Sequence, residues 1–315
     1  MAKPTISRRK ALQLFGLTAG AAVISPARAA VIQPGPVKKA VFTFCLNMAT
    51  IRGHKLGFIK ELETASKAGF RSVEIWMDTL QEYLKGGGKI REVKTRLSDL
   101  GLRVENNIGF AQWIVDDEAT RKQAIEQLKT EMALLAEIGC KRIAATGKGL
   151  TSDTTMSLDA IAERYRAVLE LGEQYGVIPL MEMWGFQKKL SRVSEVTYIA
   201  MQSGHKSAKI LLDVFHLYKG NTTMDTLSFI NPEINPILHM NDYPATLSRA
   251  VITDADRIYP GDGVAPIKQI LQTLKHHDQP LILSAELFNA IYYKQDALVV
   301  AKTALEKMKR VVEGV

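Results

Sequence analysis

The sequence predicts an α/β protein folded as a single (β/α)8 TIM barrel, and three observations support this fold class. An amphipathic helical segment ends five times in a glycine that is followed by an apolar strand. Successive glycines of this kind are 28 to 38 residues apart, about the length of one strand-plus-helix unit. No Gly-x-Gly-x-x-Gly turn follows any of the strands, which disfavours an open, doubly wound sheet.

The strands and helices alternate without a domain boundary from residue 40 to residue 315. Eight apolar strands are expected, at residues 40–46, 71–77, 102–108, 141–146, 177–183, 209–214, 236–241 and 281–287. The glycines that end helices are Gly69, Gly101, Gly139, Gly176 and Gly204, at the left-handed position that favours glycine. Clear amphipathic helices are expected at 118–138, 157–175 and 296–312. This order and length match one barrel of about 275 residues.

Residues 1–30 carry the features of an export signal. A basic stretch at 7–10 (Ser-Arg-Arg-Lys) precedes an apolar run at 11–24, and small residues at 25–29 suit a cleavage site. The paired arginines, Arg8 and Arg9, resemble a twin-arginine signal, with an ordinary secretory signal or an uncleaved anchor as alternatives. We therefore expect the twin-arginine export machinery as a partner, a periplasmic location, and a leader at residues 31–39.

Composition and charge exclude several other classes of protein. The chain is 46% hydrophobic and 23% charged, as in ordinary globular proteins. Its net charge of +8 misleads, because five basic residues and no acidic ones lie in the first 29 positions. The remainder is nearly balanced, so no nucleic-acid partner is expected. Cys45 and Cys140 fall on the first and fourth strands, on opposite sides of a barrel, so we expect buried thiols and no disulfide.

Ionisable residues stand at the ends of four consecutive strands. They are Glu182 in the fifth strand, Asp213 in the sixth, His239 in the seventh and Glu286 in the eighth. Charged groups inside apolar strands are costly unless they are paired or bind a metal, and barrel chemistry lies at the carboxyl ends of the strands. Three carboxylates and one imidazole suit one divalent ion: Mn²⁺, Mg²⁺ or Co²⁺, with Zn²⁺ possible.

With these residues, the chain resembles the xylose-isomerase-like barrel superfamily, in particular its sugar phosphate isomerase/epimerase group. That group includes tagatose/psicose 3-epimerases, hydroxypyruvate isomerase and inosose dehydratase. The resemblance covers residues 40–312 and rests on the strand-five glutamate, Asp-x-x-His after strand six, the strand-seven histidine and the strand-eight glutamate. The segment at 69–76, Gly-Phe-Arg-Ser-Val-Glu-Ile-Trp, is similar to the family's second strand.

The resemblance implies a metal-dependent mechanism. Glu182, Asp213, His239 and Glu286 would hold the ion, with Mn²⁺ as the first expectation. Glu182 and Glu286 would also be the catalytic acid/base pair, moving a proton on and off an enediolate stabilised by the metal. Glutamates on opposite faces of the enediolate would give epimerisation, and transfer along one face would give isomerisation.

Six further residues are candidates for contact with the substrate: His216, Arg257, Glu74, Trp113, Trp184 and Asn107. For His216 and Arg257, in the motif Arg-x-x-Pro-Gly-x-Gly, this role is implied by the resemblance, and a structural hydrogen bond is the alternative for His216. Glu74 could instead form a salt bridge inside the barrel, and Trp113 and Trp184 could be rim packing. Asn106 is, like Asn107, a candidate for the pocket.

The favoured function is a divalent-metal-dependent sugar or keto-sugar isomerase or epimerase acting on a small carbohydrate. The alternative is a metal-dependent lyase or dehydratase on a 3-keto sugar, keto-glycoside or inosose. A non-catalytic sugar-binding barrel is less favoured because the ligand residues are intact. A nuclease similar to endonuclease IV is disfavoured because strands two and three end without the extra histidines it needs. A homodimer is compatible with the exposed loops at the barrel mouth.

Overall fold

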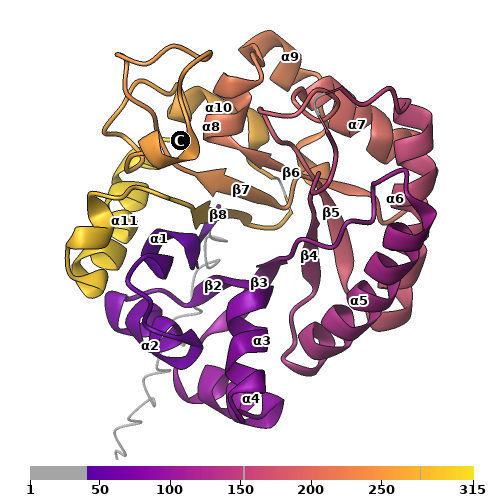
Figure 1. Ribbon diagram of the computed structural model, residues 1–315. Helices are drawn as coiled ribbons and strands as arrows, with labels where there is room; N and C mark the ends of the chain where they lie inside the picture. The colour runs from indigo at the N-terminus through magenta and orange to yellow at the C-terminus, as the bar shows by residue number, and fades with distance from the viewer. Residues whose placement is uncertain (1–40, 152, 277) are drawn as a thin grey trace, which may run out of the picture. The chain divides into compact units, whose positions relative to one another are not determined.

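The computed structural model describes residues 41–151, 153–276 and 278–315, and in them the predicted barrel is confirmed (Figure 1). The predicted signal and leader at residues 1–39 lie outside the described residues. The strands are β1 (Phe42–Asn47), β2 (Ser72–Trp76), β3 (Arg103–Ile108), β4 (Arg142–Ala145), β5 (Ile178–Glu182), β6 (Lys209–Asp213), β7 (Ile237–Met240) and β8 (Leu281–Ala285). All paired strands are parallel, in the order β3-β2-β1-β8-β7-β6-β5-β4.

Helices surround the strands on the outside of the barrel (Figure 1). The α-helices are α1 (Ala49–Arg52), α2 (Phe58–Ala68), α3 (Met77–Lys85), α4 (Ile90–Asp99), α5 (Glu118–Glu137), α6 (Leu158–Tyr175), α7 (Val193–Gln202), α8 (Val214–Lys219), α9 (Met224–Ser228), α10 (Ile267–Leu274) and α11 (Ala297–Val311). Short 3-10 turns are η1 (Pro232–Ile234), η2 (Asp254–Asp256) and η3 (Tyr292–Lys294). The three helices expected from the sequence correspond to α5, α6 and α11.

Local sequence signals set the helix ends. Asp117 accepts a hydrogen bond from the Thr120 backbone N–H at the start of α5, and Ser157 accepts one from Ala160 at the start of α6. The five glycines predicted to follow helices all have positive φ, between 61° and 103°. Gly69 has the largest value and ends α2, where a residue with a Cβ would be strained.

The edges of the rolled sheet meet between β3 and β4. These two strands end the strand order, and side chains span the seam between them. The Arg142 guanidinium donates to the Glu105 carbonyl at 3.0 Å, and the Trp113 indole donates to the Thr146 carbonyl at 3.1 Å. Side chains therefore close the seam, and β5 to β8 form a continuous series of paired strands.

One irregularity in β3 decides which side chains enter the barrel. Val73 pairs with Val104 but Glu74 pairs with Asn106, so Glu105 is an extra residue in the β3 strand. Asn106 points into the barrel and donates to Glu74 at 2.7 Å.

Two further features complete the fold. Cys45 and Cys140 are both buried free thiols, in agreement with the sequence prediction. Among the described residues, none of the helices has the length and apolar character needed to span a bilayer.

Candidate active site and metal centre

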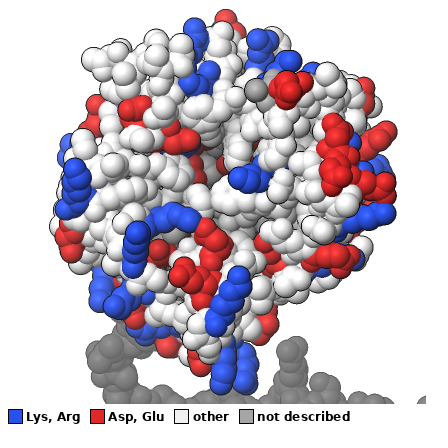
Figure 2. Space-filling view, viewed as in Figure 1, with Lys and Arg blue, Asp and Glu red and all other residues white. Residues whose placement is uncertain are grey.

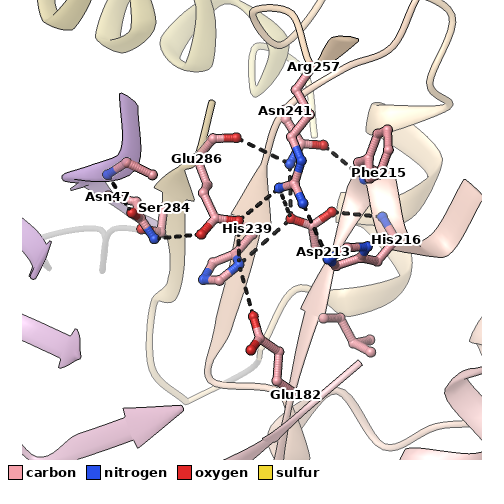
Figure 3. Close-up of polar contacts among 12 residues, drawn as sticks. Asn47, Glu182, Asp213, Phe215, His216, His239, Asn241, Arg257, Ser284 and Glu286 are labelled. Atoms are coloured by element: carbon pink, nitrogen blue, oxygen red, sulfur yellow. Dashed lines mark hydrogen bonds and ion pairs between the residues drawn. The ribbon is translucent and has the colours of Figure 1, made fainter. Parts of the chain in front are cut away.

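The four residues predicted as metal ligands come together at the carboxyl ends of β5 to β8 (Figure 3). Glu182 and Asp213 are the last residues of β5 and β6, His239 lies in β7, and Glu286 directly follows β8. The ladder aligns Asp213 with His239 and His239 with Ser284, which brings these strand ends to one level. Each of the four is at most 5% exposed.

Their polar atoms surround the Nδ1 atom of His239. Nδ1 lies 3.1 Å from Glu286 Oε2, 3.7 Å from Asp213 Oδ2 and 3.8 Å from Glu182 Oε1. Asp213, His239 and Glu286 each offer one ligand atom, and these atoms all lie within 4.8 Å of one another. One cation could therefore contact all three groups, with Glu182 beside them.

Glu74 holds His239 from the opposite side of the ring. His239 Nε2 lies 3.1 Å from both carboxylate oxygens of Glu74. Glu74 is fully buried and also accepts hydrogen bonds from Asn47, Asn106 and Ser284. Of the two roles considered for Glu74, the structure therefore shows the buried pair, because both oxygens are engaged away from the cavity.

The local charges favour the ionised form of this pair. Burial lowers the pKa of the His239 imidazole, but the carboxylates of Glu286 and Glu74 outweigh that effect and raise its pKa well above the usual value. Burial raises the pKa of Glu74, but the charge of His239 together with hydrogen bonds from His239, Ser284 and Asn106 outweighs burial and leaves the pKa lowered.

The donor set fits a divalent cation. Glu182 Oε2 is a buried polar atom without a hydrogen-bond partner, which is costly unless another group satisfies it. Because Glu74 accepts from Nε2, release of the Nδ1 proton in exchange for a cation would present the Nδ1 lone pair to the cluster, the arrangement seen when a carboxylate orients a histidine ligand. Carboxylate oxygens with one imidazole suit Mn²⁺ or Zn²⁺ among other divalent ions.

Arg257 places a guanidinium beside the cluster, as expected for a residue near the reacting centre. Its Nη1 donates to Asp213 Oδ2 at 2.7 Å and to Glu286 Oε2 at 2.8 Å. Its Nε and Nη2 donate to Asp254 Oδ1, and Nη2 lies 3.2 Å from His216 Nε2. His216 and Arg257, two of the six predicted substrate contacts, are thus brought to the site.

Asp242 fixes the loop that carries Arg257. Its Oδ2 accepts from the backbone N–H groups of Gly261 and Gly263, each at 3.0 Å, and its Oδ1 accepts from Ala265. The backbones of Asp242 and Ile258 also exchange two hydrogen bonds. Sequence reasoning missed Asp242, although its place two residues after β7, ahead of the loop that contains Gly261 and Gly263, is a usable signal.

Two asparagines also escaped sequence reasoning. Asn47 donates to Glu74 at 2.8 Å and to Glu286 Oε1 at 3.1 Å, and its own oxygen accepts from the Trp76 indole. Asn241 donates to Asp213 Oδ2 at 3.0 Å (Figure 3). Both side chains orient carboxylates of the cluster, and neither residue type stands out at the end of an apolar strand.

A cavity of about 330 Å³ opens above the cluster. Twelve residues line it: Trp76, Ile108, Phe110, Glu182, Trp184, Phe186, Gln187, His216, Asp254, Arg257, Glu286 and Phe288. Figure 2 shows a hollow near the middle of this face, with acidic side chains inside it and mostly uncharged residues around it. Trp184 is therefore at the cavity, as predicted.

Trp113 and Asn107 lie elsewhere, which corrects two of the substrate contacts expected from the sequence. Trp113 is 2% exposed and packs against Tyr165 at the seam between β3 and β4. Asn107 faces the helix layer, because its Nδ2 and Glu131 Oε2 of α5 both lie next to Gly109. Neither residue lines the cavity, and Asn106 is the β3 asparagine inside the barrel.

Burial changes the pKa of two ionisable residues that line the cavity, Glu182 and His216. Burial raises the pKa of Glu182 to about 8; His239 opposes this shift and the carboxylate of Glu286 adds to it. Burial lowers the pKa of His216 to about 4, so its imidazole is neutral near pH 7. A glutamate with a raised pKa next to a second glutamate in one cavity is a pair that can serve as an acid and a base.

Two known proteins that are similar in sequence to this chain share the name inosose isomerase. Inosose isomerase of Halalkalibacterium halodurans is 27% identical over 276 residues, covering 85% of this chain and 95% of that protein. Inosose isomerase of Bacillus licheniformis is 28% identical over 280 residues, covering 85% and 97%.

Solved structures share the fold. A protein described as IOLI with a bound zinc atom has a TM-score of 0.79 at 24% identity, covering 86% of this chain and 98% of its own. An L-ribulose 3-epimerase has a TM-score of 0.68 at 18% identity, covering 86% and 95%. The family described as xylose isomerase-like TIM barrel matches residues 62–311. The chain belongs to the xylose isomerase-like TIM barrel family.

Proposed function

We propose that this protein is a divalent-metal-dependent isomerase or epimerase acting on a keto-sugar or a cyclic keto-polyol such as an inosose. The observation that carries the proposal is the placement of Glu182 and Glu286. They approach His239 Nδ1 from different strands, at 3.8 Å and 3.1 Å, and both line the cavity. The relatives named inosose isomerase support this reaction class and this type of substrate.

The residues that would hold the metal are Asp213, His239, Glu286 and Glu182. A divalent cation bound there would stabilise the negative charge that develops on substrate oxygens when a neighbouring C–H loses its proton. The zinc of the structural neighbour supports a divalent ion, and we propose Mn²⁺ or Zn²⁺ as its identity here.

The protein side chains would carry the proton transfer. Glu286, which accepts a hydrogen bond from Arg257, would remove the proton from the carbon next to the carbonyl. Glu182, with its pKa raised by burial, would return a proton from the other side. Arg257 would orient a substrate oxygen, and the neutral His216 could accept from or donate to a hydroxyl group. Transfer between the two glutamates inverts the carbon, whereas one glutamate acting alone moves the carbonyl.

Incubation of inososes and unphosphorylated ketoses with the metal-supplied protein in deuterated water tests this proposal. We expect deuterium to enter the carbon beside the carbonyl without loss of water, and an isomer or epimer to accumulate. An α,β-unsaturated ketone absorbing in the ultraviolet would indicate the lyase instead. Absence of both exchange and elimination would contradict a catalytic role.

Substitution of the two glutamates separates catalysis from folding. Glu182→Gln and Glu286→Gln should each lower turnover by at least about 100-fold, the usual effect of losing a general acid or base. Glu131→Gln is a matched control, because Glu131 is also a buried glutamate but lies on α5, outside the cavity lining. Near-wild-type activity of either site variant would show that the two-glutamate mechanism is wrong.

We also propose export of the folded protein through the twin-arginine pathway. The support is the basic, apolar and small-residue order of residues 1–30. An enzyme outside the cytoplasm would meet unphosphorylated sugars, which agrees with the substrate class proposed above.

A further inference from the structure

Above the carboxylate cluster, the cavity wall is a row of aromatic side chains that the proposed reaction does not require. Trp76, Phe110, Trp184 and Phe288, here called the aromatic arc, all line the cavity. Ring centroids are 5.4 Å apart for Trp76 and Phe110, 6.0 Å for Trp76 and Phe288, and 6.4 Å for Phe110 and Trp184. These spacings make the arc one continuous apolar surface.

The sequence places the arc next to the cluster. Trp184 follows Glu182 by two positions, and Phe288 follows Glu286 by two. Glu182 is the last residue of β5 and Glu286 directly follows β8, so both aromatic residues lie in the segments that leave the carboxyl ends of these strands. The chain thus lines one cavity with polar groups at the strand ends and with aromatic rings from the segments beyond them.

Phe186 extends the apolar surface to the far side of the mouth. It lies in the segment after β5, lines the cavity and is 45% exposed. Its ring is 5.5 Å from the ring of His216 and 5.8 Å from that of Phe215. A large aromatic ring exposed at the rim of a cavity is available to contact a ligand.

The charges of the cavity disfavour an anionic substituent. Among the described residues that line it, Arg257 is the one Lys or Arg, and its guanidinium is bonded to Asp213, Glu286 and Asp254. Glu182, Glu286 and Asp254 also line the cavity. Two cations lie behind the rings: the Arg52 guanidinium is 4.3 Å from the Trp76 ring and paired with Asp78, and the Lys219 ammonium is 5.0 Å from the Phe186 ring and donates to two backbone carbonyls. Because both are already engaged and neither lines the cavity, a phosphate inside it would meet rings and carboxylates.

The aromatic part of the cavity also offers few partners for sugar hydroxyl groups. Apart from Gln187, Asp254 and two indole N–H groups, the polar groups of the cavity lining belong to residues that form or contact the carboxylate cluster, namely Glu182, His216, Arg257 and Glu286. The Trp76 indole N–H is already engaged by Asn47 at 2.8 Å. A hydroxyl buried against the arc would lose its hydrogen bonds to water, whereas an apolar group would gain from leaving water.

We propose that the substrate is an uncharged sugar or keto-polyol that carries an apolar, aromatic substituent, such as the aglycone of an aryl glycoside. The sugar ring lies beside the carboxylate cluster and the substituent packs between the aromatic arc and Phe186. The assignment of the sugar as the reacting part of this substrate rests on the proposed function. The preference for an uncharged ligand with an apolar substituent rests on the residues that line the cavity alone.

Calorimetric titration with three unreactive probes tests the inference: methyl β-D-glucopyranoside, phenyl β-D-glucopyranoside and phenyl β-D-glucopyranoside 6-phosphate. None of them has a carbonyl group, so none can turn over by the proposed chemistry. In Mn²⁺-supplied protein, the phenyl glycoside should bind roughly tenfold more tightly than the methyl glycoside, the effect of aromatic contacts in a buried site. The phosphorylated probe should bind at least roughly tenfold more weakly than the phenyl glycoside.

Two variants and one control locate the effect. Phe186→Ala should remove most of the preference for the phenyl glycoside and leave the affinity for the methyl glycoside unchanged. Phe229→Ala is the matched control, because Phe229 is 90% exposed and does not line the cavity. Gln187→Lys, which puts a cation at the mouth, should strengthen binding of the phosphorylated probe.

The outcomes separate this inference from the proposed function. Equal affinity for the methyl and phenyl probes, no binding of the phenyl probe, or tight binding of the phosphorylated probe would overturn the inference. So would an unchanged preference in Phe186→Ala. Turnover of keto-sugars with no phenyl preference would refute the inference alone, and a phenyl preference without any turnover would refute the proposed function alone.

Discussion

The Nε2 atom of His239 lies 3.1 Å from both carboxylate oxygens of Glu74, and neither side chain is exposed to solvent. This pair joins β2 to β7 across the interior of the barrel. It sets the orientation of the imidazole and leaves Nδ1 facing Asp213 and Glu286. The position of one proposed metal ligand therefore depends on a carboxylate that does not itself belong to the ligand cluster.

Substitution of Glu74 should weaken metal binding without removing any proposed ligand. Glu74→Gln keeps the shape of the side chain but loses the charge that holds His239 Nε2–H, and loss of such a partner commonly costs about 10- to 100-fold in metal affinity. Competition with a chelator, followed by elemental analysis, measures this. Glu131→Gln should bind metal as the wild type does. Unchanged affinity in Glu74→Gln would contradict the orienting role.

Direct removal of a ligand gives a stronger effect. Asp213→Ala should lose most of the bound metal, because Asp213 Oδ2 lies 3.7 Å from His239 Nδ1 within the cluster. About one equivalent of a divalent metal in the purified wild type, absent from the variant, is the expected elemental analysis. A wild type without metal, and without thermal stabilisation by any divalent ion, would remove the basis for the proposed mechanism.

The loop that carries Arg257 should be sensitive to a single added methyl group. A Cβ at Gly263 would lie 2.2 Å from the Tyr243 carbonyl oxygen and 2.4 Å from Asp242 Oδ1, so Gly263→Ala must displace the loop. We expect kcat/KM to fall at least roughly tenfold with metal content unchanged, since a misplaced orienting group is costly. Gly86→Ala is the control, because a Cβ there meets nothing closer than 3.4 Å. Equal activity of both variants would show that the loop adapts.

Glu61 on α2 should make stability depend on pH. Burial raises its pKa from 4.5 to about 7, with Arg52 opposing the shift and Asp78 adding to it. Because the folded-state pKa is the higher one, this group stabilises the fold below about pH 4.5, and the contribution is lost as pH rises through 7.

The variant Glu61→Gln removes this dependence. The difference in free energy of unfolding between Glu61→Gln and the wild type should shift in favour of the variant as pH rises from about 4.5 to about 8. The shift should reach up to about 3 kcal/mol. Denaturant unfolding across this range measures the difference, with Glu137→Gln, an exposed glutamate at the end of α5, as the control. Parallel stability profiles for the wild type and Glu61→Gln would contradict the prediction.

Export should depend on the two arginines of the N-terminal segment. Arg8→Lys combined with Arg9→Lys keeps the charge but removes the pair that defines a twin-arginine signal, so the protein should remain in the cytoplasm. Cell fractionation and immunoblotting report the location, and Lys3→Gln controls for a change of charge. Continued export of the double variant would favour an ordinary secretory signal.

The barrel and the four cluster residues could be predicted because both leave local signals. Each helix-ending glycine is visible in the sequence, and an ionisable residue such as Asp213 interrupts an apolar strand. The sequence could not decide whether Glu74 contacts substrate or forms a buried pair. Its partner His239 is 165 residues away, and only strand pairing brings the two residues together.

The two substrate contacts predicted incorrectly, Asn107 and Trp113, each have a specific structural cause. The extra residue Glu105 in β3 shifts the alternation of side chains, so Asn106 and not Asn107 enters the barrel. Trp113 follows β3 as expected, but its loop folds over the end of β4, where the indole N–H finds the Thr146 carbonyl. Neither a bulge nor the path of a loop is fixed by the pattern of apolar residues.

The seam between β3 and β4 protects the protein from unwanted association. A strand at the edge of a sheet presents backbone groups that can recruit strands from other chains and begin aggregation. Here the two edges face each other, and Arg142 and Trp113 cover them with contacts to Glu105 and Thr146. Among the described strands, both edges of the sheet are therefore covered, and neither is left open to pair with a strand of another chain.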